Sequence, residues 1–291
     1  MGNLTCTNVC KNYKDAKVLK NIDLTIEPGK IYGLIGRNGV GKTTLLSILS
    51  AQNPASSGAV TLDDQPVWEN AKALSRICFS RELNAMNDGM ANNVKVDRYL
   101  KTASIYYPYW DEEMADRLVR DFGLDRKKPM SKLSKGMLSM ITIIVALASK
   151  AEYTFLDEPA AGLDVVARED FYRLLIDEYT KTGRTFIVST HIIDEAADVF
   201  EEVIILKDGK ILLKENTDEL LERAVHISGA EKDVDACCAG MECYGASKMG
   251  RSKGVTVLLK DGQSIGRDKD VTVQPMTLQQ LFAALCGRES E

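Results

Sequence analysis

The sequence predicts an α/β fold with a parallel sheet at its core. An apolar run at 31–36 leads through a glycine-rich turn into a helix, and two further apolar runs, at 152–157 and 185–190, are separated by a helical stretch at about 165–181. Short apolar runs of this kind are typical of buried parallel strands. Because such strands alternate with helices here, the pattern favours a right-handed α/β layer.

The elements around this core follow from local composition. Residues 3–10 and 18–27 have the β-rich composition of strands, and EPGK at 27–30 is a turn. The residues at 43–50 begin a helix. VIILKDGKILL at 203–213 predicts a hairpin with an Asp-Gly turn.

Two segments differ from this alternation. Residues from about 82 to 130 show helical spacing, with breaks at Pro108 and Gly123, and predict a helical insertion. The tail from 223 to 291 predicts a small α+β appendage. Its candidate strands and closing helix are AVHISG, GVTVLLKDG, VTVQP and TLQQLFAALCG, the helix being closed by Gly287. The expected domains are therefore 1–222 and 223–291.

Composition excludes some classes of protein. The chain has 291 residues, of which 45% are hydrophobic and 27% are charged, as in ordinary globular proteins. Its net charge of −5 disfavours a nucleic-acid-binding protein. Seven cysteines without a regular spacing predict reduced thiols. The N-terminus has no apolar signal-peptide region, and the longest apolar segment, about 137–148, is shorter than the ~20 residues that span a bilayer.

GRNGVGKT, from Gly36 to Thr43, matches the phosphate-loop pattern G-x-x-x-x-G-K-[ST] between a strand and a helix. Its glycines let the backbone bend so that N–H groups point at phosphate oxygens, and the helix N-terminus faces the same anion. We expect Lys42 to reach the outer phosphates and the Thr43 hydroxyl to bind Mg²⁺. The nucleotide-binding candidates here are Gly36, Arg37, Asn38, Gly39, Val40, Gly41, Lys42, Thr43 and Thr44.

Three further candidates follow buried strands. Asp157 ends the strand in EYTFLDEP, at the sheet edge where open α/β sheets bind ligands, and is a candidate Mg²⁺ ligand. Glu158, the next residue, is a candidate base for the attacking water. His191 in VSTHIIDEA follows the last apolar strand and is a candidate for a hydrogen bond to the γ-phosphate. A solvated strand end and a helix-start histidine are the alternative interpretations.

The stretch LSKGMLSM at 133–140 precedes another apolar run. Ser134 and Gly136 have the chemistry of a helix start, and the same serine, backbone N–H groups and helix N-terminus also suit an anion. Local sequence leaves both interpretations open.

The order GRNGVGKT, LSKGM, LDEP, AGLD (161–164) and STH resembles the ATP-binding subunit of an ABC transporter over roughly residues 4–222. The resemblance implies a P-loop NTPase of the ABC type, with a parallel-sheet core, an N-terminal antiparallel β subdomain and a helical subdomain. It also implies an ATPase with ATP and Mg²⁺ as ligands that powers a separate transmembrane permease. Segments 104–125 and 133–137 are similar to those of bacterial exporters of drugs and antibiotic peptides, which implies export.

The resemblance adds site residues. It implies that Tyr13 stacks on adenine and that Asp164 lies in a loop communicating between two sites. Ser134 and Gly136 match a signature that closes over ATP held by a facing protomer, so the resemblance implies a dimer. Glu82 stands where the family usually has glutamine and is a further candidate for Mg²⁺. Lys135 and Met137 stand where glycine and glutamine are common.

The expected partners are a second ATP-binding subunit, identical or different, and an integral membrane permease, with no nucleic acid. The expected location is cytoplasmic, on the inner face of the membrane through the permease. The helical insertion would meet the permease, with Tyr106, Tyr107, Tyr109 and Trp110 as interface anchors or as local packing. The alternatives are a soluble ABC ATPase acting on ribosomes or DNA and a regulatory subunit with low turnover.

Overall fold

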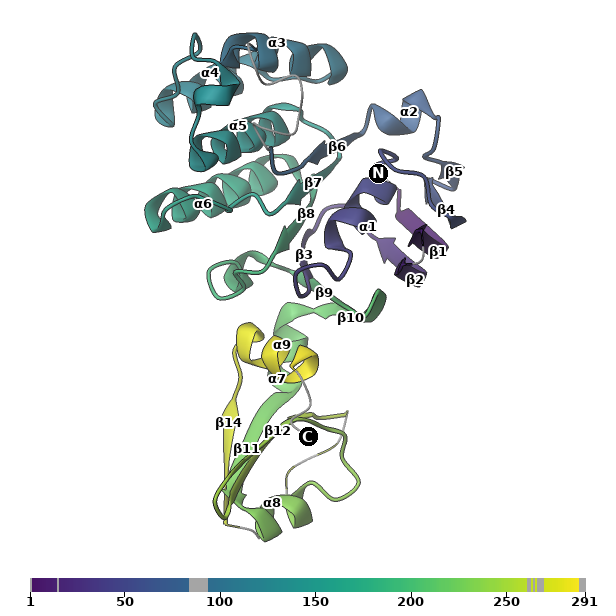
Figure 1. Cartoon of the computed structure of the whole chain (residues 1–291), viewed down its shortest axis with the longest axis vertical. Coiled ribbons are helices and arrows are strands. Elements are labelled where there is room, and N and C mark those ends of the chain that lie inside the picture. The colour runs from purple at the N-terminus through teal and green to yellow at the C-terminus, as the bar shows by residue number, and fades with distance from the viewer. Residues whose placement is uncertain are drawn as a thin grey trace.

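The computed structural model describes residues 2–14, 16–83, 94–260, 263, 265 and 270–287. Within these residues the strands form three sheets. Figure 1 shows the third sheet set apart from the other two along the long axis of the molecule. Residues 84–93, in the predicted helical insertion, lie outside the described residues.

The central sheet has the order β10-β9-β3-β8-β7-β6. Its strands are β3 (Ile31–Ile35), β6 (Ile77–Ser80), β7 (Tyr153–Asp157), β8 (Thr185–Thr190), β9 (Glu202–Lys207) and β10 (Lys210–Asn216). The five strands from β9 to β6 pair in parallel, which confirms the predicted core. β9 and β10 form the predicted hairpin, and Asp208 and Gly209 turn with φ values of 51° and 77°. The sequence prediction missed β6, because four residues are too few to show a period.

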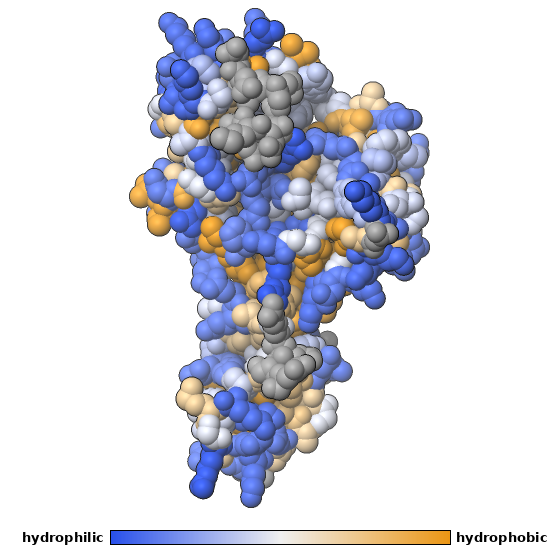
Figure 2. All heavy atoms as spheres, in the orientation of Figure 1, coloured by the Kyte–Doolittle hydropathy of each residue, from blue (hydrophilic) through white to orange (hydrophobic). Residues whose placement is uncertain are grey.

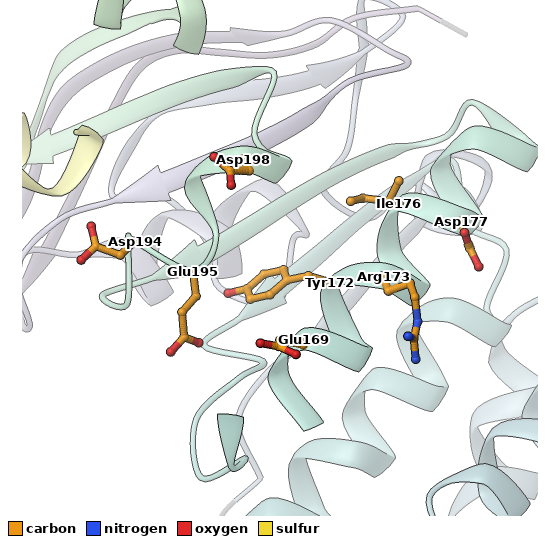
Figure 3. Close-up of a pocket in the computed structure, with 8 residues that line it drawn as sticks. All are labelled: Glu169, Tyr172, Arg173, Ile176, Asp177, Asp194, Glu195 and Asp198. Carbon is orange, nitrogen blue, oxygen red and sulfur yellow. The ribbon is translucent and has the colours of Figure 1, made fainter. Parts of the chain in front are cut away.

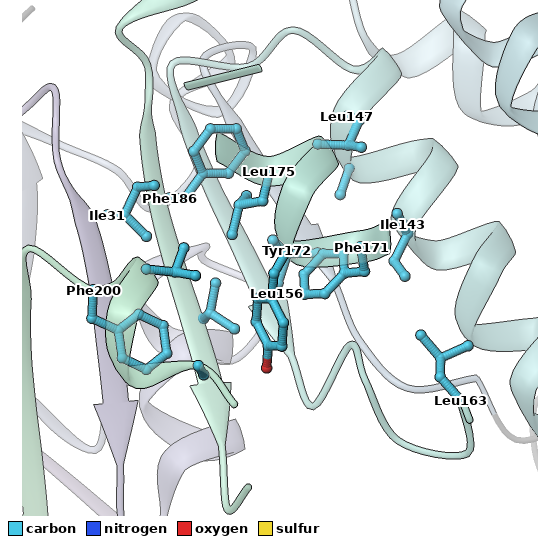
Figure 4. Packing of buried hydrophobic residues seen from close by; sticks show 14 of the residues in the cluster. Ile31, Ile143, Leu147, Leu156, Leu163, Phe171, Tyr172, Leu175, Phe186 and Phe200 are labelled. Carbon is cyan, nitrogen blue, oxygen red and sulfur yellow. The ribbon is translucent and has the colours of Figure 1, made fainter. Parts of the chain in front are cut away.

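Alternate residues of the parallel strands face opposite sides of the sheet. Ile31 packs in one core cluster with α5 (Lys135–Ala148) and α6 (Val165–Thr182), whereas Tyr32 packs in a second cluster with α1 (Lys42–Leu49). Because both faces of these strands are buried, their sequences are continuous apolar runs. Figure 4 shows the first cluster, where the sheet and the two helices contribute Ile31, Ile143, Leu147, Leu156, Phe171, Tyr172, Leu175 and Phe186.

The N-terminal sheet has the order β2-β1-β4-β5 and is antiparallel. It consists of β1 (Leu4–Tyr13), β2 (Ala16–Ile26), β4 (Ser57–Leu62) and β5 (Gln65–Pro66), and α2 (Ala71–Leu74) follows it. Its buried side chains share a cluster with α1. The antiparallel β subdomain is therefore present, and it covers the face of the central sheet that carries α1.

The helical segment contains α3 (Val96–Tyr106), α4 (Glu112–Asp121) and the short 3₁₀ helix η1 (Met130–Lys132), and it leads into α5. The predicted breaks hold, because α3 ends before Pro108 and α4 ends before Gly123, whose φ is 61°. None of the helices in the described part of the chain is both long and apolar enough to cross a membrane.

The C-terminal part is mixed α+β, as expected. It contains α7 (Thr217–Arg223), β11 (Ala224–Ala230), α8 (Glu231–Cys237), β12 (Cys243–Met249), β13 (Ser252–Leu258), β14 (Val271–Pro275) and α9 (Leu278–Cys286). The sheet order is β12-β13-β11-β14. The sequence prediction missed α7, α8 and β12, and the last two residues of its second strand candidate, 261–262, lie outside the described residues.

The last helix, α9, packs in the large core cluster and not in the cluster of the third sheet. Its Leu281 and Leu285 are buried in the same cluster as α5 and α6, whereas Ile227 and Val255 of the third sheet form a separate small cluster. The helix ends before Gly287, as predicted, and the φ of Gly287 is −59°.

Candidate functional site

The phosphate loop connects β3 to α1, as the sequence predicts. Gly39 and Gly41 have φ values of 79° and 113°, which side chains rarely tolerate. A Cβ atom on Gly41 would also lie 2.9 Å from Cδ2 of Leu19, and one on Gly36 would lie 2.8 Å from the carbonyl oxygen of Leu206. The glycines are therefore required by backbone conformation and by close packing under the loop.

Lys42 begins α1 and is 6% exposed. Its Nζ donates a hydrogen bond to the Gly36 carbonyl at 2.8 Å, and it lies 3.4 Å from Oε1 of Glu158. A buried ammonium group needs such partners, because burial without them is costly. An anion entering the loop would meet a cation that already has a carboxylate beside it.

Asp157 and Ser189 are register partners at the ends of β7 and β8. Oδ1 of Asp157 accepts a hydrogen bond from Ser189 Oγ at 2.6 Å, and the carboxylate is 5% exposed. Burial raises the pKa of Asp157, while hydrogen bonds from Ser189 and Thr43 and the charge of Lys42 act in the opposite direction. Thr43 and Asp157, which the sequence pairs as metal ligands, thus lie side by side.

Glu158 has a strained backbone. Its φ is 50°, a left-handed conformation that is uncommon outside glycine and asparagine. Its N–H, shared between the carbonyl oxygen and Oγ of Ser189 at 3.1 and 3.0 Å, holds this conformation. One carboxylate oxygen, Oε2, lies 2.6 Å from Nδ1 of His191. The two candidates for catalysis therefore contact each other.

A cavity of about 440 Å³ brings most of the predicted residues together. Its lining residues are Arg37, Asn38, Gly39, Gly41, Lys42, Thr43, Thr44, Glu82, Lys135, Glu158, Ala161 and His191. The candidates outside this lining are Tyr13, Gly36, Val40, Ser134, Gly136, Asp157 and Asp164. The cavity therefore joins the phosphate loop to segments more than 100 residues further along the chain.

Tyr13 lies at the end of β1 and is 45% exposed. Lys11 covers one face of its ring, with Nζ 5.0 Å from the ring centroid, and Asn53 donates a hydrogen bond to its hydroxyl. Stacking on adenine therefore has to use the other face, and that role remains a prediction.

The signature residues have local structural roles. Ser134 caps α5, and its Oγ accepts a hydrogen bond from the N–H of Met137 at 3.2 Å. A Cβ atom on Gly136 would lie 2.7 Å from the carbonyl oxygen of Gly162, so the start of α5 packs directly on that loop. Asp164 caps α6 in the same way, accepting from the N–H of Ala167 at 2.9 Å. The interpretation as helix caps is confirmed, and contact with a facing chain stays a prediction.

Two contacts of the cavity were missed by sequence reasoning. Lys135 Nζ lies 2.7 Å from Oε1 of Glu82, so two of the three departures from the family pattern form an ion pair. Arg37 donates a hydrogen bond at 3.4 Å to the carbonyl of Cys286, which is 249 residues away at the end of α9. Lys207 donates to the neighbouring Leu285 carbonyl at 2.8 Å. Nothing in the local sequence indicates such distant partners.

A second cavity, of about 400 Å³, lies between α6 and the segment that follows β8. Figure 3 shows its lining residues, which are Glu169, Tyr172, Arg173, Ile176, Asp177, Asp194, Glu195 and Asp198. Its lining is mainly acidic and contains none of the candidate site residues. Such an acidic lining would repel a phosphate.

Several known proteins are similar to this chain in sequence. The family described as "ABC transporter" matches residues 19–161. The ABC transporter ATP-binding protein YtrB of Bacillus subtilis is 29% identical over 220 residues, which cover 75% of this chain and 74% of YtrB. The aliphatic sulfonates import ATP-binding protein SsuB of Albidiferax ferrireducens is 29% identical over 241 residues, covering 82% of this chain and 80% of SsuB.

A solved structure shows the same fold. The ATP-binding cassette MJ0796, in a dimeric post-hydrolysis state bound to ADP and Pi, superposes with a TM-score of 0.63 at 23% identity. The match covers 74% of this chain and 98% of that one. The predicted fold, a parallel-sheet core with an antiparallel β subdomain, is thereby confirmed.

Proposed function

We propose, on the premise that residues 19–161 are an ATP-binding domain of the ABC transporter family, that this chain is the ATP-hydrolysing subunit that powers a separate membrane permease. The observation that carries the proposal is the 440 Å³ cavity, in which the phosphate loop, Glu158 and His191 line one space. A loop of N–H groups, a buried lysine and a carboxylate suit binding and hydrolysis of a nucleoside triphosphate.

The phosphates are bound by the N–H groups of the loop and by Lys42. Because Lys42 lies 3.4 Å from Glu158, phosphate binding has to replace that carboxylate as the partner of Lys42. Glu158 is then released to accept a proton from water. Hydrolysis thus uses a carboxylate that the ligand itself sets free.

His191 holds the other oxygen of Glu158. The carboxylate is an acceptor, so Nδ1 of His191 donates in this contact, at 2.6 Å. A hydrogen bond from Nδ1 of His191 to a phosphate therefore requires the ring to release Glu158. We propose that His191 makes this exchange when ATP binds.

The residues around Asp157 fit Mg²⁺. Carboxylate and hydroxyl oxygens are the ligands that this cation prefers, and the buried Asp157 carboxylate has the Thr43 side chain beside it. We propose that Thr43 and Asp157 hold Mg²⁺, with Glu82 of the cavity lining as a further ligand. The bound cation would neutralise phosphate charge.

We propose that ATP joins two ATP-binding subunits, identical or different. Ser134, Gly136 and Asp164 would then face the phosphates held by the other chain. The proposal is supported by the resemblance of the signature and by the dimeric state of the similar structure MJ0796. The hydroxyl of Ser134 can still donate to an anion, because its cap uses only an oxygen lone pair.

The surface for the permease is proposed at the end of α3. Ile105, Tyr106 and Tyr109 are 77%, 74% and 67% exposed, whereas Tyr107 and Trp110 pack against the core. Figure 2 shows a few hydrophobic side chains within a mostly hydrophilic surface at this end of the molecule. Exposed aromatic side chains are common anchors of interfaces. Docking here would hold the chain on the inner face of the membrane.

We further propose that residues 1–222 form the ATP-binding domain, that 223–291 form an accessory domain, and that transport is export. The export proposal rests on the segments 104–125 and 133–137, while relatives such as SsuB are named as import proteins. The alternative of a low-turnover regulatory subunit has less support, because Glu158 and His191 are both in place. A ribosome- or DNA-acting ATPase has less support, because the sequence carries a single phosphate loop and no long heptad stretch.

The test compares Lys42→Ala with Lys20→Ala, a change of an exposed lysine on β2. We expect Lys42→Ala to lose ATP binding in titration calorimetry and Lys20→Ala to keep it. Purification together with neighbouring membrane proteins should recover a permease. Unchanged ATP affinity of Lys42→Ala would refute the site, and recovery of ribosomes alone would refute the transport role.

A further inference from the structure

Lys11 is a buried lysine that the chemistry described so far does not use. It lies on β1, two residues before Tyr13, and is 8% exposed. Its Nζ donates hydrogen bonds to Oδ1 of Asn53 and to the carbonyl of Pro54, both at 2.7 Å. An ammonium group is costly to bury without such acceptors, so the two contacts fix the place of this cation.

Lys11 and Asn53 together hold the ring of Tyr13. Nζ of Lys11 lies 5.0 Å from the ring centroid, which is within the range of a cation–π contact. Asn53 accepts from Lys11 through Oδ1 and donates from Nδ2 to the Tyr13 hydroxyl. Tyr13 nevertheless stays 45% exposed, so the ring keeps free surface away from Lys11.

The pairing of the strands does not fix this ring. β1 pairs with β4 only as far as Cys10, and its pairing with β2 shifts register on both sides of Lys11. Beyond Cys10, the contacts to the segment before β4 are the Lys11 side chain and a hydrogen bond from the Asn12 N–H to Ser56 Oγ at 3.0 Å. Side-chain contacts therefore replace the ladder at the end of β1.

These contacts lead to the helix of the phosphate loop. Asn53 follows α1, and its N–H donates to the carbonyl of Ser47 in that helix at 3.1 Å. Through Lys11 and Asn53, Tyr13 is thus connected to the element whose first turn faces the phosphates.

Tyr13 also lies close to the phosphate loop. Val18 of β2 packs on the loop, since a Cβ atom on Gly41 would lie 3.2 Å from its Cγ1. Tyr13 pairs with Ala16, two residues before Val18, which is about 7 Å along a strand that rises ~3.3 Å per residue. A nucleotide whose phosphates lie in the loop therefore has its base within reach of the ring.

We propose that Lys11 and Asn53 are positioning residues for the base of the nucleotide, which hold the Tyr13 ring so that its free face stacks on adenine. The inference rests on the proposed function, since it takes ATP as the ligand. A ring that is already fixed loses less conformational entropy when a base stacks on it. Lys11 thus raises the affinity for ATP without touching the nucleotide.

The test compares binding of Mg-ATP with binding of Mg-tripolyphosphate, which has the phosphates and no base, to the full chain by titration calorimetry. Lys11→Met removes the ammonium group, and Lys17→Met changes an exposed lysine of β2 as the control. We expect Tyr13→Ala to weaken ATP at least ~5-fold and Lys11→Met, which frees the ring without removing it, about 3-fold. The affinity for tripolyphosphate should not change, and Lys17→Met should bind both ligands as the wild type does.

A double variant shows whether Lys11 acts through the ring. In a chain that already carries Tyr13→Ala, Lys11→Met should cause no further loss of ATP affinity. A further loss of the same size would overturn the inference. So would a parallel loss of ATP and tripolyphosphate by Lys11→Met, because a purely structural role of Lys11 would disturb the phosphate loop and both ligands.

Asn53→Ala provides the same comparison if Lys11→Met does not fold. It removes the one side chain that both Lys11 and the Tyr13 hydroxyl bind. Loss of these hydrogen bonds should weaken ATP about 2-fold or more and leave tripolyphosphate unchanged. Wild-type ATP affinity of Asn53→Ala would refute the positioning role.

The wild type distinguishes this inference from the proposed function. If the wild type binds ATP and tripolyphosphate with equal affinity, the base contributes nothing, and only the inference is refuted. If the wild type binds neither ligand, the proposed function fails, and the inference fails with it.

Discussion

Replacing Glu158 by glutamine removes the carboxylate that competes with phosphate for Lys42. The two groups lie 3.4 Å apart, and their side chains are 18% and 6% exposed. With an effective dielectric constant of about 20, their attraction is about 5 kcal/mol, and desolvation of both groups offsets most of it. If ~1.4 kcal/mol remains, ATP should bind Glu158→Gln about 10-fold more tightly than the wild type.

The same substitution should slow hydrolysis, because the neutral amide cannot accept a proton from water. A positioned general base contributes ~10²–10⁴-fold, so phosphate release should fall at least about 100-fold. Titration calorimetry gives the affinity, and size-exclusion chromatography with ATP should show the dimer accumulating. The control is Glu169→Gln, an exposed carboxylate of the second cavity. An unchanged ATP affinity would refute the competition for Lys42, and wild-type turnover would remove Glu158 from the base role.

Three further predictions concern stability and can be measured by thermal or denaturant unfolding. Gly162→Ala should destabilise the protein by ~1–2 kcal/mol, because φ is 81° and the new Cβ atom would collide with Lys135; a change within ~0.3 kcal/mol would contradict this packing. Asp157→Asn should raise the melting temperature of the ligand-free protein at neutral pH. Burial raises the pKa of Asp157, so the folded state binds the proton more tightly than the unfolded state and loses stability as the pH rises through that pKa. The gain should shrink as the pH is lowered through the same pKa, and a pH-independent difference would contradict the argument. Leu281→Ala should cost about 2–5 kcal/mol and lower the single unfolding transition of the whole chain, because Leu281 is fully buried in the cluster of α5 and α6; a separate early transition would show that α9 unfolds independently.

The elements that sequence reasoning found have strong local signals. Ile31–Ile35 is an apolar run buried on both faces, and Gly39 and Gly41 after it have the positive φ values of a tight turn. The Asp208-Gly209 turn is also indicated by its residue types, since few residue types adopt its positive φ values. Such features depend on neighbours in the chain, so the sequence alone reveals them.

The missed elements lack local signals. β6 is too short for a period, and β12, Cys243–Met249, is mostly exposed, so its pairing with β13 is not marked by apolar alternation. The hydrogen bonds from Lys207 and Arg37 to the last carbonyls of α9 likewise join distant segments of the chain. Long-range contacts override local preferences at these places.

The candidate site also combines features that follow from local sequence with features that follow from tertiary structure. Sequence by itself determined which residue types could do phosphate chemistry, since the spacing from Gly36 to Thr43 and the strand ends at Asp157 and His191 are local patterns. Only the tertiary structure decided their partners, such as the pairing of Lys135 with Glu82. The physical reason is that backbone conformation depends on adjacent residues, whereas charge pairing and burial depend on which distant segments the folded sheet brings together.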